Sequence, residues 1–191
     1  MSTENANKIF AEEFLSDSRD FLKRFNILLE QSLNSYIGMR SKLLIDLLFS
    51  AECCLKALIL LNSGTSISRK SFFNHNLNNL LSLLSGDDYS FCKEHLNDNL
   101  ISFSAQNRYM VESQKTFRTN LILNETYYNT IAKHQWFVSV SENIKKIIDY
   151  VSDKIGSPIK VVKISDIDIE KIKQINECRV KFKKSINKKT V

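Results

Sequence analysis

Apolar residues recur at three- and four-residue steps over three long stretches of this chain, the spacing typical of helices that bury one face. The pattern predicts helices over about 8–36, 40–61 and 125–152. In the second of these, apolar positions cover most of the circumference, so we expect that helix at the centre of a bundle. Shorter apolar runs predict two short helices, over about 75–84 and 89–102.

The end of the chain changes character after the last long helix. The β-prone runs 159–164 and 179–184 predict two strands, and residues 166–175 between them predict a short helix. These elements are too few for an independent domain. We therefore predict a helical bundle over 1–153 and a small mixed α/β appendage over 154–191, which packs on the bundle, pairs with another chain or orders on binding.

The basic character of the chain belongs to this appendage. The net charge of the chain is +6, while residues 154–191 alone hold 11 Lys or Arg against 4 Asp or Glu. A basic tail adds salt-dependent, sequence-independent attraction to phosphate backbones. The candidate RNA-binding residues are Lys181, Lys183, Lys184, Lys188 and Lys189. An acidic protein partner, or a solvated end with no partner, remains an alternative.

Composition narrows the class of protein. Only 4 Gly and 1 Pro are present, which favours an all-α fold over a many-stranded one. The 4 Cys form no CxxC pair and the 3 His are scattered, so we expect reduced thiols and no zinc or other cofactor. No apolar run reaches the ~18 residues that span a bilayer. The first residues lack the layout of a signal peptide, so we expect a cytoplasmic protein without membrane contact.

The helix predicted over 40–61 carries few polar residues, and they fall on one stripe. Among them Glu52 and Lys56 lie four positions apart in the favourable orientation for an ion pair. One interpretation is a partly buried pair that only stabilises the helix. The other, on which the functional predictions depend, is that the pair faces a water-accessible groove where Glu52 orients a functional His or Arg.

Several short motifs follow one another in a recognisable order. They are Ala51-Glu52 with Lys56-Ala57, then His75-x-Leu77-x-x-Leu80, then Arg108-Tyr109 before the last long helix. Over roughly residues 40–150 this order resembles the HEPN superfamily. The resemblance implies an up-down helical bundle with two long helices plus shorter ones, a homodimer, and a bacterial toxin–antitoxin or antiphage defence role, in some cases beside a protein partner from the same system.

The catalytic branch of that superfamily implies a metal-independent ribonuclease. Its members carry Arg, a polar residue, a spacer and then His at the start of the last helix. Here Asn129 and His134 stand at the matching spacing, while Tyr128 occupies the place of the Arg. A second Arg-to-His spacing joins Arg69 to His75. The departure at Tyr128 favours a protein that binds without cleaving.

Five residues are the candidates for chemistry. They are Glu52, Arg69, His75, Arg108 and His134. An imidazole can move a proton on or off the RNA 2′-hydroxyl or the leaving oxygen near neutral pH, and an Arg can brace a phosphate through two hydrogen bonds. Simpler roles stay open: His75 capping its own helix, Arg108 clamping loop carbonyls, and His134 packing as an ordinary helix residue.

Three functions compete at this point. The primary expectation is a protein that binds RNA or nucleotide through a cleft of the bundle and the basic tail. The first alternative is a metal-independent endoribonuclease toxin. The second alternative is a non-catalytic dimeric adaptor that recruits a protein partner. Whether the chain is an enzyme is left open by the residues themselves.

Overall fold

The computed structural model describes residues 3–31, 37–62, 72–103, 121–156, 175–178 and 180. Over these residues the chain is helical with short connections and contains no strand, so the predicted all-α class is confirmed there. None of the helices in these ranges combines the length and the apolar character that crossing a bilayer requires.

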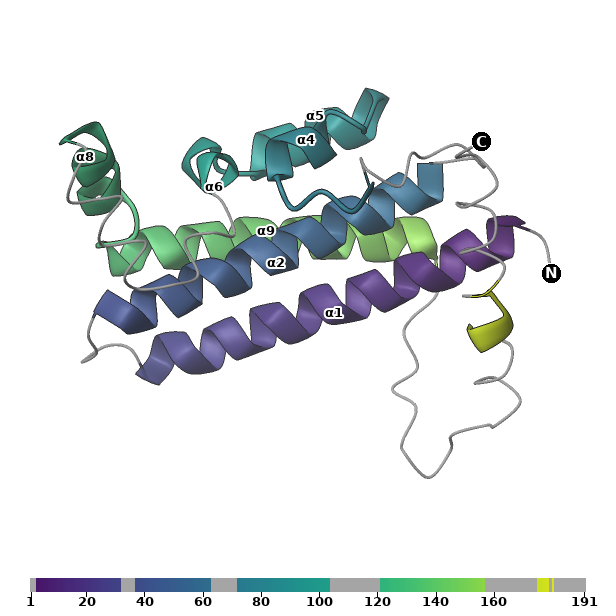
Figure 1. The fold of residues 1–191 in the computed structure, drawn as a ribbon, viewed down its shortest axis with the longest axis horizontal. Coiled ribbons are helices and arrows are strands. Elements are labelled where there is room, and N and C mark those ends of the chain that lie inside the picture. Colours follow the sequence, from purple (N-terminus) through teal and green to yellow (C-terminus); the bar gives the residue numbers. More distant parts are fainter. Residues whose placement is uncertain are drawn as a thin grey trace.

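Three long helices form the body of the molecule (Figure 1). They are α1 (Thr3–Gln31), α2 (Ile37–Asn62) and α9 (His134–Ile155). Each of the three contacts the other two, and α2 runs antiparallel to α1 but in the same direction as α9. Residues 50–60 of α2 are buried without interruption, which confirms the predicted central position of this helix.

Polar side chains join α1 to α2 inside the bundle. The Ser18 hydroxyl donates to the carbonyl of Ser50 at 2.9 Å, and the Ser50 hydroxyl donates to the carbonyl of Ser18 at the same distance. Nearer the other end, Arg24 holds the buried carboxylate of Asp46 with two nitrogens, one of them Nε at 2.9 Å. Part of the polar stripe predicted on α2 therefore serves the α1–α2 contact.

The last predicted helix is broken in the structure. The sequence predicts one helix over 125–152, but α8 (Leu121–Asn129) ends and α9 begins only after a turn. Across that turn Arg40 of α2 donates from Nη1 to the carbonyls of Ile131 at 2.8 Å and Ala132 at 2.5 Å. The prediction of one continuous helix is wrong because a distant arginine satisfies carbonyls that helical hydrogen bonds would otherwise use.

Three short helices lie along one side of α2 and α9 (Figure 1). They are α4 (Leu77–Leu81), α5 (Gly86–His95) and α6 (Asp98–Ser102). The single helix predicted over 89–102 is divided between α5 and α6, because the Asn97 side chain accepts from the backbone N–H groups of Asn99 and Leu100 and starts a new helix.

The appendage is described only in part. Residues 175–178 are helical, and Cys178 is buried within the hydrophobic core. Val180, inside the strand predicted over 179–184, is also helical, so that prediction is wrong at this residue. The strand predicted over 159–164 lies outside the described residues, and a mixed α/β appendage stays a prediction.

Candidate functional site

Glu52 and Lys56 form an ion pair inside the protein. The Lys56 Nζ donates to Glu52 Oε1 at 2.6 Å, and only 6% of Glu52 and 5% of Lys56 are exposed. The pair is therefore buried much more deeply than the sequence predicts for side chains that face a water-accessible groove. Two charges removed from water are stable only with close geometry and further hydrogen bonds. The role of the pair therefore depends on the other side chains that contact it.

Two phenylalanine rings surround the Lys56 ammonium. Its Nζ lies 5.9 Å from the ring centroid of Phe14 on α1 and 5.8 Å from that of Phe72, which precedes α4. The two rings meet edge-on, with centroids 5.7 Å apart. Ammonium groups at such distances interact favourably with aromatic faces, so the two rings stabilise the cation in addition to Glu52.

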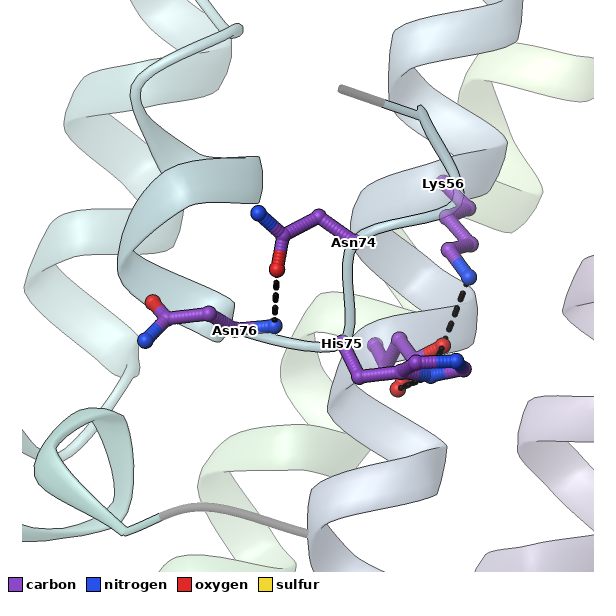
Figure 2. Close-up of polar contacts among 5 residues, drawn as sticks. Lys56, Asn74, His75 and Asn76 are labelled. Carbon is purple, nitrogen blue, oxygen red and sulfur yellow. Dashed lines mark hydrogen bonds and ion pairs between the residues drawn. The ribbon is translucent and has the colours of Figure 1, made fainter. Parts of the chain in front are cut away.

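His75 completes the cluster and connects it to solvent. Its Nδ1 lies 3.0 Å from Glu52 Oε1 and 3.2 Å from Oε2, and Figure 2 shows its ring turned toward the same place as the Lys56 amine. The His75 side chain is 64% exposed. Because a carboxylate can only accept, Nδ1 must carry the proton of this contact. The expectation that Glu52 orients a histidine fits this geometry, and Nε2 is the ring nitrogen left for a ligand.

Asparagines on either side fix the backbone that carries His75. The Asn74 Oδ1 accepts the backbone N–H of Asn76 at 2.9 Å, and the Asn76 Oδ1 accepts that of Asn79 at 3.1 Å. Figure 2 shows both asparagine side chains on the opposite side of the segment from His75. Asn76, not His75, is thus the N-cap of α4, so a capping role for His75 is wrong.

The other candidates are not gathered at this cluster. His134 is the exposed first residue of α9, the position that the HEPN resemblance implies for a histidine. It lies beside the turn held by Arg40, and Arg40 stands twelve positions before Glu52 on α2, or about 18 Å of helical rise. Within one chain His134 and His75 are therefore apart. Arg69, Arg108 and the tail lysines Lys181, Lys183, Lys184, Lys188 and Lys189 lie outside the described residues.

A third buried carboxylate, beside Asp46 and Glu52, was not singled out from the sequence. Asp88 of α5 is 4% exposed, and its Oδ1 accepts from the Tyr150 hydroxyl at 2.6 Å and from Lys154 Nζ at 2.5 Å, while its Oδ2 accepts from the Asn62 amide. Burial raises the pKa of Asp88, but the hydrogen bonds from Lys154, Tyr150 and Asn62 outweigh it and leave the pKa below its usual value. No local motif foretold this cluster, because its members come from three helices.

The cysteines belong to the core. None of the four is in a disulfide, as the sequence predicts, and all four are buried. Burial raises the pKa of Cys53, Cys54 and Cys92 to about 12, so these groups stay protonated at neutral pH and are poor nucleophiles and poor metal ligands. Within the described ranges, no three side chains of His, Cys, Asp or Glu gather closely enough to hold a metal ion.

Comparison of the chain with models of known protein families, with curated proteins and with solved structures finds no match in any of the three. Any functional conclusion therefore depends on the cluster of Glu52, Lys56 and His75 and on the resemblance of its motifs.

Proposed function

We propose that this chain is an HEPN-like protein of the bacterial defence or toxin class that binds RNA or nucleotide, with His75 as a contact for phosphate. The observation that carries the proposal is an exposed imidazole whose Nδ1 is held by a buried carboxylate. When the ring carries two protons, Nδ1 donates to Glu52 and Nε2 donates to a phosphate oxygen. The Lys56 ammonium balances the Glu52 charge, so a protonated His75 gives the cluster a net positive charge.

The basic appendage and a second copy of the chain belong to the same proposal. Lys181, Lys183, Lys184, Lys188 and Lys189 supply sequence-independent attraction to a phosphate backbone. The HEPN resemblance implies a homodimer, in which the sites of two chains serve one ligand. The cytoplasm is the proposed location because RNA and nucleotides are found there.

Titration of labelled single-stranded RNA at two salt concentrations tests the proposal. His75→Gln removes the imidazole donor at an exposed position, and we expect roughly a tenfold loss of affinity at the lower salt concentration. Changing the five tail lysines to Gln keeps Cys178 in the core and should lower the salt dependence by up to about 0.7 in log–log slope for each lost phosphate contact. The proposal fails if the unmodified chain binds neither RNA nor mononucleotide, and the adaptor alternative then becomes the one to test, by searching for a protein partner.

The Glu52 contact also supports a second candidate, a metal-independent endoribonuclease. A neutral imidazole that donates Nδ1–H to a carboxylate presents the Nε2 lone pair outward, which is the arrangement of a general base. Nε2 would take the proton of the RNA 2′-hydroxyl while that oxygen attacks the adjacent phosphorus and the 5′-oxygen of the next nucleotide leaves with a proton from a second acid. The strand is cut and a 2′,3′-cyclic phosphate remains.

Incubation with RNA in the presence of EDTA separates cleavage from binding. An endoribonuclease should yield fragments that end in a cyclic phosphate, and His75→Gln should abolish them. Absence of cleavage, or cleavage that survives the combined His75→Gln and His134→Gln changes, rules out this candidate. Binding of RNA by the same preparation without cleavage leaves the primary proposal standing.

A further inference from the structure

An exposed aromatic ring stands beside the proposed phosphate contact. Phe73 is 52% exposed, two residues before His75, so their Cα atoms lie no more than about 7 Å apart. Exposure of single apolar residues is common on protein surfaces and explains nothing by itself. What distinguishes Phe73 is the ring contact that positions it and the imidazole of His75 two residues further along the chain.

The ring of Phe73 packs on Phe72, whose own ring contacts the Lys56 ammonium of the Glu52 cluster. It meets the buried ring of Phe72 edge-on, with centroids 5.5 Å apart and planes at 83°. Phe72 in turn packs against Phe14 and against the Lys56 ammonium. The position of the exposed ring is therefore set by the contacts that also place Lys56, and through it Glu52. An aromatic side chain whose ring is already positioned by packing loses little conformational entropy when a flat ligand stacks on it.

We infer that Phe73 is the stacking surface for a nucleobase whose neighbouring phosphate contacts His75. The inference rests on the proposed function and narrows it to a substrate class, an unpaired base joined to phosphate. Stacking on one aromatic ring tolerates any base, because every base has a π face. A base paired in a duplex already has both faces covered by its neighbours, so duplex RNA and inorganic polyphosphate are poor ligands of this site.

Binding of four labelled or competing probes tests the inference. They are a short single-stranded RNA, the same RNA annealed to its complement, an abasic oligonucleotide of equal length, and AMP as competitor. Phe73→Leu removes the aromatic face at a half-exposed position, and Phe73→Tyr keeps it. Tyr89→Leu is the matched control, because Tyr89 is an exposed aromatic residue of α5 outside the Glu52 cluster. Circular dichroism confirms that each variant is folded.

The expected result is a loss of affinity for single-stranded RNA of about 5- to 100-fold in Phe73→Leu, with Phe73→Tyr and Tyr89→Leu near the unmodified chain. The abasic oligonucleotide and the duplex should bind weakly and be indifferent to Phe73→Leu. Competition by AMP that depends on Phe73 identifies a free nucleotide as a sufficient ligand. RNA binding that depends on Phe73 without competition by AMP identifies a strand, and both results support stacking.

Two results overturn the inference. If Phe73→Leu binds single-stranded RNA as tightly as the unmodified chain, or if the abasic probe binds as well as RNA, no base stacks on this ring. In both cases binding by the unmodified chain persists, so the proposed function survives. If the unmodified chain binds none of the probes, the proposed function itself is wrong, and the inference that Phe73 stacks on a base is then wrong as well.

Discussion

Glu52 and Asp88 are both buried carboxylates that accept a hydrogen bond from a lysine, but they differ in the kind of side chain that connects them to solvent. The described partners of Asp88 are Asn62 on α2 and Tyr150 and Lys154 on α9, and the side chain of Lys154 is 37% exposed. The outermost described partner of Glu52 is His75, which reaches solvent with a ring nitrogen to spare. A buried ion pair alone does not mark a functional site, but a buried carboxylate that orients a mostly exposed imidazole is a candidate for one.

The packing around Asp88 supports a purely structural role for that residue. Tyr150, which donates to Asp88, stacks on Phe91 of α5 with ring centroids 4.1 Å apart and planes at 14°. The same tyrosine lies under the Lys154 ammonium, at 5.1 Å from its ring centroid. Asp88 therefore clamps α5 to the C-terminal ends of α2 and α9. The following changes test whether one carboxylate serves stability and the other serves binding.

Glu52→Leu should have the largest effect on stability, a loss of about 3–5 kcal/mol in the free energy of unfolding. The change leaves the buried Lys56 ammonium without its counter-charge. Glu52→Leu combined with Lys56→Met should recover most of that loss, because both charges are then replaced by apolar groups. Urea unfolding followed by circular dichroism measures both variants. Equal losses in the two would show that the stranded cation is not the cause.

The double variant also separates folding from binding. His75 then has no carboxylate behind it, so RNA affinity should stay low although stability returns. Recovery of RNA affinity along with stability would contradict a role for Glu52 in orienting His75.

Asp88→Asn should cost about 2 kcal/mol of unfolding free energy at pH 7, because the charge-assisted hydrogen bonds from Lys154 and Tyr150 weaken. RNA affinity should not change, since α5 carries no part of the His75 site. The measurement is urea unfolding beside the RNA titration. A drop in affinity with an intact fold would place Asp88 in the functional site after all.

Acid should remove the stabilisation that Asp88 provides. The pKa of Asp88 is lower in the folded chain than its usual value, near 3.9 in an unfolded chain, so below that pH the unfolded chain binds more protons. The contribution is complete above about pH 5 and is lost as the pH falls through the folded pKa. Urea midpoints at pH 7 and pH 3 should therefore fall more for the unmodified chain than for Asp88→Asn. Parallel falls in both would contradict this.

Tyr150→Phe should cost about 1.5 kcal/mol, the lower end for one hydrogen bond to a charged group, because the ring and its stacking on Phe91 are retained. The same unfolding experiment measures it. A cost equal to that of Asp88→Asn would mean that Tyr150, rather than Lys154, provides most of the clamp.

His75→Gln should have the smallest effect on stability, within about 0.5 kcal/mol, because the side chain is mostly exposed. Its large effect should be on RNA affinity. A substantial loss of stability in His75→Gln would show that the Glu52 contact, like that of Asp88, mainly fastens one segment to another.

The sequence by itself determined the helical class, the extent of α2 and its central place, and the absence of paired thiols among the four cysteines. These are consequences of local periodicity and of side-chain chemistry. The sequence also predicted that Glu52 and Lys56 matter, because charges on an otherwise apolar helix need partners.

Only the tertiary structure decided which side chains pair with these buried charges. His75 meets Glu52 through a chain separation that no periodicity encodes, and Asp88 finds Tyr150 and Lys154 at a still longer separation. The break before α9 follows in the same way from Arg40, whose guanidinium holds carbonyls about ninety residues further along the chain. Polar contacts of this kind are set by how helices pack against one another, and a single helix in the sequence carries no record of them.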